Sequence, residues 1–253
     1  MDEGSRNRLL EFIFELSQGN AIAPFRDWII DDEVENLFLE RLGKKINIQS
    51  KVMRNGVSGI IGMEASLVED VSEELKKELL EKVNSLETFK TIFSTQKSIE
   101  SARDYSSYME KVTPRFEEVR RKERLQKGRE TQFEDALKSF LRDFFSSRLI
   151  KFFLKYGFPV TRTDMNLDEL IEILKKLPAT NTYFSLLDQR DRNLDRKIKP
   201  NDLSDLMSFT MGIAYCDVLF GEKMFVDMAK KSKLDKLYDT IITSSLKEFK
   251  KAI

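Results

Sequence analysis

The sequence predicts a helix-rich α/β fold in which a small parallel sheet carries a large all-helical insertion. Along most of the chain, apolar residues recur at intervals of three and four, the spacing of one helix face. Near the carboxyl terminus, Ala214–Phe220 and Thr240–Thr243 have the length and apolar content of short buried strands. A helical pattern over Met224–Ala229 separates them, so we expect a strand–helix–strand crossover with parallel strands.

We expect one domain over residues 1–253, with residues 1–45 and 198–253 forming the sheet region and residues 70–195 the helical insertion. Before residue 45 the predicted elements are a helix over 5–17 followed by Gly19, a strand at Ala21–Ala23 stopped by Pro24, and a helix from Asp31 or Asp32 to Gly43. Within 46–66, Gly56, Gly59 and Gly62 recur without a GxxxxGK[ST] or GxGxxG pattern, which favours a connection over a phosphate-binding loop.

The insertion is predicted to be helical and highly charged. Its helices are expected at Glu73–Phe93, Ile99–Val112, Phe133–Tyr156, Leu167–Leu174 and around Leu186, with Pro114 as a break or first turn and Pro178 as an end. The basic segment 115–129 also contains interleaved glutamates, so a salt-bridged helix face is favoured over a phosphate contact. The run Phe140–Leu154 is apolar on most sides, which favours a buried core helix over a platform for stacking bases.

Composition narrows the chemistry available to the chain. It has no histidine and one cysteine, Cys216, so Ser-His and Cys-His pairs and the usual Cys/His zinc sites are excluded within it. Clustered Asp and Glu remain, and these suit Mg²⁺ or Mn²⁺. The 43 basic and 43 acidic residues balance, and no segment has the apolar length of a membrane span. We expect a cytoplasmic protein.

The candidate site is a group of carboxylates around the strand Ala214–Phe220. Asp202 and Asp205 are three residues apart, which places both on one side of a helix predicted to follow an N-cap at Asn201. Glu222 follows the carboxyl end of the strand, the edge at which open parallel sheets bind ligands. The alternative is that these acids only compensate helix dipoles. Asp217, placed in mid-strand, would need a partner, an edge position or a proton.

These segments resemble the PIN-like nucleases, whose fold is Rossmann-like, and in particular bacterial PIN-like proteins with a helical insertion. The resemblance rests on Pro200-Asn201-Asp202-Leu203-Ser204-Asp205, on Ala214-Tyr215-Cys216-Asp217-Val218-Leu219 with Glu222-Lys223, and more weakly on Leu16-Ser17-Gln18-Gly19-Asn20-Ala21-Ile22-Ala23-Pro24. It covers residues 8–43 and 198–253. In the family, acids from four places bind metal. The third corresponds to Asp202 or Asp205, the fourth to Glu222 and the second to Asp32 or Glu33, whereas the first has no counterpart here.

The resemblance implies a metal-dependent ribonuclease or endonuclease, which can be degenerate or inactive. Asp202, Asp205 and Glu222 would be catalytic metal ligands for Mg²⁺ or Mn²⁺, with Asp32 or Glu33 assisting, and Lys223 would contact phosphate. The alternative is a non-catalytic helical subunit that binds a protein partner or nucleic acid. The expected partners are RNA, single-stranded nucleic acid or a protein, and not a membrane.

Overall fold

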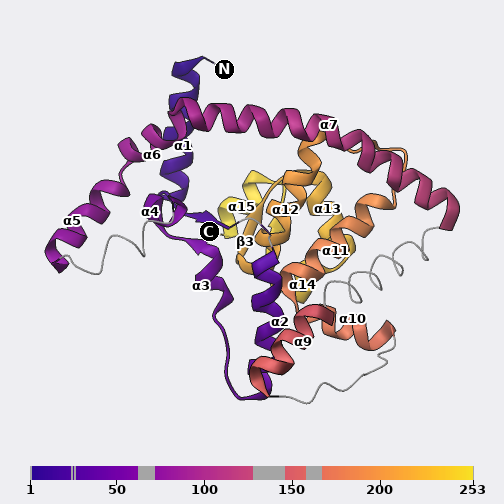
Figure 1. Cartoon of the computed structure of the whole chain (residues 1–253). Helices are drawn as coiled ribbons and strands as arrows, with labels where there is room; N and C mark the ends of the chain where they lie inside the picture. Colours follow the sequence, from indigo (N-terminus) through magenta and orange to yellow (C-terminus); the bar gives the residue numbers. More distant parts are fainter. Residues whose placement is uncertain are drawn as a thin grey trace. The chain divides into compact units, whose positions relative to one another are not determined.

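A computed structural model describes residues 2–23, 25, 27–61, 72–127, 146–157 and 167–252 (Figure 1). The chain forms two compact units: one comprises Met1–Ala23 and Gln49–Met109, and the other comprises Pro24–Ile48 and Glu110–Ile253. In the described part of the chain, no helix is both long enough and apolar enough to cross a membrane. The helix-rich character predicted from periodicity is confirmed.

The first unit is a small helical assembly around a two-stranded antiparallel sheet. Its elements are α1 (Glu3–Ser17), β1 (Ala21–Ile22), β2 (Met53–Arg54), α4 (Gly56–Ile61), α5 (Glu73–Val83) and α6 (Leu86–Ser94). Strand β1 pairs with β2, and α1 packs on α6. Leu10 of α1, Val57 of α4 and Phe89 of α6 form one buried cluster. The glycine-containing segment is therefore a packed connection that includes α4, as far as it is described. Gly62 lies outside the described residues.

The second unit contains the parallel pair of strands and most of the buried core. Its elements are α2 (Asp27–Arg41), α9 (Ser146–Tyr156), α10 (Leu167–Lys175), α11 (Pro178–Asp191), α12 (Pro200–Tyr215), β3 (Val218–Phe220), α13 (Lys223–Lys231), α14 (Leu234–Leu237), β4 (Ile241–Thr243) and α15 (Leu246–Ala252). Two further helices contribute residues to both units: α3 (Ile48–Val52) and α7 (Gln96–Lys127).

The predicted crossover is confirmed, because β3 and β4 pair in parallel and α13 and α14 lie between them in sequence. The strand expected from Ala214 is shorter than predicted. Ala214 and Tyr215 form the last turn of α12, since Ile213 packs into the same buried cluster as Leu206 and Phe209 at helical spacing. Asp217 is exposed and precedes β3 rather than lying within it.

Several predicted helix boundaries are wrong. Helix α2 begins at Asp27, before the expected start, and Ser85 separates α5 from α6, where its Oγ accepts the N–H of Thr88. Pro114 lies inside α7 instead of ending a helix. Pro178 follows the end of α10 at Lys175, as predicted, and it also occupies the first turn of α11, where its missing N–H leaves no backbone partner unpaired.

The aromatic run was expected to be buried on several sides, and this is wrong for its described part. Residues 140–145 lie outside the described residues. In α9, Phe152 is buried against Phe38 of α2, whereas Ile150 and Leu154 are exposed, Leu154 by 70%. Helix α9 is therefore amphipathic and covers one side of α2.

Candidate functional site

Asp202, the first predicted metal ligand, is buried in the first turn of α12 and has its carboxylate fully hydrogen-bonded. Its Oδ2 accepts the backbone N–H of Lys199 at 2.9 Å. The guanidinium of Arg196 donates to both carboxylate oxygens, at 2.8 and 2.9 Å. The bidentate ion pair with Arg196 and the hydrogen bond from Lys199, the N-cap residue of α12, hold the preceding loop against the helix.

Asp205 and Glu222 lie within electrostatic reach of the same arginine. Burial raises the pKa of Asp205, and the negative charges of Glu222 and Asp202 raise it further, while Arg196 opposes the shift. The pKa of Arg196 is raised first by its hydrogen bonds to Asp202, and the charges of Glu222 and Asp205 add to this. Arg196 therefore binds Asp202 directly, whereas it interacts with Asp205 and Glu222 through their charges.

Glu33 has a different role from the one the resemblance implies. Its side chain is 1% exposed and caps the start of α11. It accepts hydrogen bonds from the N–H of Ala179 at 2.6 Å, from the N–H and Oγ1 of Thr180 at 3.1 and 2.7 Å, and from the hydroxyl of Tyr215 at 2.6 Å. Burial raises the pKa of Glu33, and these hydrogen bonds partly offset the effect. Asp32 is half-buried beside it.

The described residues contain no group of three or more His, Cys, Asp or Glu side chains arranged to hold a metal ion. For Asp202, the reason is that both of its oxygens already face Arg196. For Glu33, all four hydrogen bonds come from α11 and Tyr215. Metal binding at these predicted ligands stays a prediction that the side-chain geometry does not favour.

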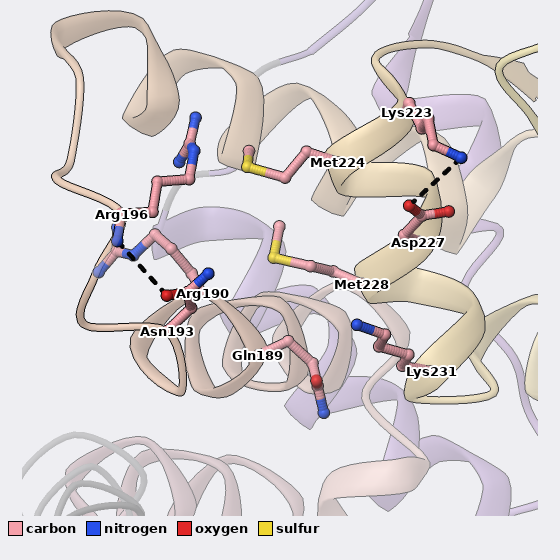
Figure 2. A pocket seen from close by; sticks show the side chains of 9 residues that line it. All are labelled: Gln189, Arg190, Asn193, Arg196, Lys223, Met224, Asp227, Met228 and Lys231. Atoms are coloured by element: carbon pink, nitrogen blue, oxygen red, sulfur yellow. Dashed lines mark hydrogen bonds and ion pairs between the residues drawn. The ribbon is translucent and has the colours of Figure 1, made fainter.

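A pocket of about 380 Å³ lies between α11, the loop that follows it and α13 (Figure 2). Its lining residues are Gln189, Arg190, Asn193, Arg196, Lys223, Met224, Asp227, Met228 and Lys231. Four of these side chains are cationic and one is anionic, and the anion, Asp227, lies 3.8 Å from the Nζ of Lys223. A lining of this composition favours an anionic ligand.

Arg190 is a buried lining residue whose hydrogen bonding is incomplete. Its side chain is 8% exposed, and its Nε donates to Asp191 at 2.9 Å. Its Nη1 is buried, and no described residue accepts a hydrogen bond from it. A buried donor without an acceptor typically costs about 1 to 3 kcal/mol, so an anion that reaches this nitrogen would recover that energy.

Helix α7 holds the loop that carries Asn193 and Arg196. Arg120 is buried and donates to the carbonyl oxygens of Arg190, Asn193 and Arg196 at 3.4, 3.4 and 2.9 Å. Glu117 accepts hydrogen bonds from Arg120 and from the N–H of Ile198. Burial raises the pKa of Glu117, but these donors and Arg121 outweigh it and lower the pKa to about 2. Arg120 and Glu117 of α7 therefore hold this wall of the pocket in place.

The sequence analysis expected Lys223 to contact phosphate, but it did not identify the other residues that line the pocket. The signal was present at helical spacing: Gln189 and Asn193 are four residues apart, as are Met224 and Met228. What was missing was the packing of α13 against α11, which brings the residues of the two helices together.

Comparison of the chain with protein-family models, curated proteins and solved structures found no match.

Proposed function

We propose that the protein binds single-stranded nucleic acid, RNA or DNA, through the pocket between α11 and α13 and acts as a non-catalytic binding subunit. The observation that carries this proposal is the lining of the pocket, in which Arg190, Arg196, Lys223 and Lys231 outnumber the single carboxylate of Asp227. Phosphate contacts by lysine and arginine supply most of the sequence-independent affinity for nucleic acid.

The non-catalytic part of the proposal rests on Arg196. In a metal-dependent nuclease, carboxylates must offer oxygens to a cation that activates water. Here the guanidinium of Arg196 binds both oxygens of Asp202, and its charge also interacts with those of Asp205 and Glu222. The same side chain lines the pocket. A cation entering the cluster would have to displace an ion pair whose anionic partner, Asp202, is 3% exposed.

The binding proposal is tested by fluorescence anisotropy with labelled single-stranded RNA and DNA over a series of salt concentrations. Lys223→Ala/Lys231→Ala removes two lining charges, so the slope of log K against log salt should become shallower by about 1.4, because each single-strand contact contributes about 0.7. Lys230→Ala/Lys236→Ala is the matched control, since both lysines are exposed and neither lines the pocket. Equal slopes for the two variants, or no binding by the wild type, would contradict the proposal.

A PIN-like metal-dependent nuclease is the second candidate, and one observation favours it. The charges of Asp205 and Glu222 converge with that of Asp202, as the resemblance implies for metal ligands. Under the binding proposal, Mn²⁺ and Mg²⁺ produce no cleavage of single-stranded RNA. Cleavage that requires Mn²⁺ and disappears in Asp205→Asn would replace the binding proposal with the nuclease. Cleavage that persists in Asp205→Asn would instead indicate a contaminating enzyme, which a mock purification would reveal.

A further inference from the structure

Arg190 lines the pocket and carries a buried donor for which the described residues offer no acceptor. The residue is 9% exposed, its Nη1 is buried without a described hydrogen-bond partner, and its Nε is bound to Asp191. Guanidinium groups match the paired oxygens of phosphate, and they are less strongly hydrated than lysine. The buried fork of Arg190 therefore favours a phosphate oxygen over water at this position.

Asn193 supplies a second donor beside it. Its Oδ1 accepts the backbone N–H groups of Asp195 and Arg196 at 3.1 and 3.4 Å, and this fixes the orientation of the amide. The Nδ2 of Asn193 therefore points away from those two backbone groups and remains able to donate. Lys231 is exposed at the other side of the pocket and adds a mobile charge.

The opposite wall has a different chemistry. Met224 and Met228 extend from α13 across the pocket toward the two arginines (Figure 2). Met228 is buried in the core, and Met224 is half-buried against it, so the thioethers form a supported apolar surface. Methionine sulfur makes favourable contacts with aromatic rings. Gln189 lies on the α11 side and offers an amide that can pair with the edge of a base.

We propose that the pocket holds one nucleoside monophosphate unit, with its phosphate at the guanidinium groups of Arg190 and Arg196 and its base against Met224 and Met228. The volume of about 380 Å³ is near the lower end for small-molecule sites, which suits one nucleotide and not several. This inference rests on the proposed function and deepens it. The same chemistry is offered by a free nucleotide and by the phosphorylated end of a strand.

Calorimetric titrations of the full chain separate these ligands. The probes are adenosine, adenosine 5′-monophosphate, and one single-stranded oligonucleotide prepared with and without a 5′-phosphate. We expect the phosphorylated oligonucleotide to bind at least about tenfold more tightly than its unphosphorylated form, which is the effect of one charge-assisted fork. Equal affinities for the two oligonucleotides and no binding of the monophosphate would overturn the inference and leave the proposed function intact. Binding of the monophosphate without binding of either oligonucleotide would support the inference and end the proposed function.

Substitutions locate the phosphate. Arg190→Lys keeps the charge but removes the fork, and it should lose about tenfold in affinity for the phosphorylated probe, with little change for the unphosphorylated one. If circular dichroism shows that this variant is unfolded, Lys231→Ala tests the cationic lining instead: it should weaken binding of the phosphorylated probe more than binding of the unphosphorylated one, with the neighbouring exposed residue changed in Lys230→Ala as its control. Loss of affinity for both probes alike in the folded variant would place the phosphate elsewhere and overturn the assignment.

Discussion

Two buried charged residues mark the two ends of α11, and their surroundings differ. At the start of the helix, Glu33 accepts four hydrogen bonds from Ala179, Thr180 and Tyr215. At its end, Arg190 has one bonded nitrogen, Nε, and one buried nitrogen, Nη1, without a described acceptor. A buried charge that is fully hydrogen-bonded belongs to the fold, whereas one that lacks a partner is open to a ligand. The comparison supports a structural role for the start of α11 and agrees with the proposed binding role for its end.

The largest expected effect follows from removing the fully bonded charge. Glu33→Ala leaves the donors of Ala179, Thr180 and Tyr215 buried without an acceptor, and we expect a loss of about 3 to 5 kcal/mol in the free energy of unfolding. Glu33→Gln keeps one acceptor oxygen and should lose about 1 to 2 kcal/mol. Urea unfolding followed by the fluorescence of Trp28, the single tryptophan, measures both.

The control is Glu172→Gln, because Glu172 is exposed and, among the described residues, is bound to Lys175 three residues away, so a change within about 0.5 kcal/mol is expected. If Glu33→Ala were as stable as this control, the division of α11 into a structural end and a binding end would be wrong.

The pH dependence of stability should have opposite signs at the two ends. Glu117 supports the loop beside Arg190, and its pKa is lowered from 4.5 to about 2. The stability it contributes is present above pH 4.5 and is lost as pH falls toward about 2. The pKa of Glu33 is raised from 4.5 by burial, so its contribution is largest below pH 4.5 and declines as pH rises through the higher folded value.

The measurement compares the free energy of unfolding of wild type with Glu117→Gln and Glu33→Gln between pH 3 and 8 in steps of about one unit. For Glu117→Gln, we expect a deficit of about 1 to 2 kcal/mol at neutral pH that shrinks toward pH 3, since solvent screens this partly exposed pair. For Glu33→Gln, the deficit should instead shrink as pH rises. Parallel curves for the two variants would show that the two carboxylates do not differ as proposed.

The sequence predicted the parts of the fold that depend on local pattern. Apolar spacing placed α1 and the β3–α13–β4 crossover, because each element has a continuous apolar face. Local pattern could not place the end of α12, since a buried last turn and a buried strand have the same apolar content around Ala214 and Tyr215. Pro114 was misread for a related reason: a proline signals a break, but the rest of α7 continues around it.

The candidate site was predicted from the spacing of Asp202 and Asp205 and from the place of Glu222 after the strand. The structure shows that the charges of Glu222 and Asp202 act on Asp205, and the role of these carboxylates as a site stays a prediction. Sequence reasoning missed Arg196, because it lies in a loop without a periodic pattern. Its guanidinium pairs with Asp202, and its carbonyl oxygen accepts a hydrogen bond from Arg120 of α7. Likewise, Arg190 became a candidate only when its buried Nη1 was seen to lack a partner.

The smallest effect on stability, and the sharpest test of the binding end, comes from Asp227. It is half-exposed, and its Oδ2 lies 3.8 Å from the Nζ of Lys223, so Asp227→Asn should change the free energy of unfolding by less than about 0.5 kcal/mol.

The same substitution should strengthen binding. Because Asp227 is the only carboxylate in the described pocket lining, its neutralisation raises the net positive charge that an anionic ligand meets. Affinity for a 5′-phosphorylated oligonucleotide should therefore rise about two- to fivefold at low salt, and the gain should fade as salt screens the charge. Glu172→Gln makes the same charge change on α10 outside the lining, and a gain of equal size there would attribute the effect to net charge rather than to the pocket.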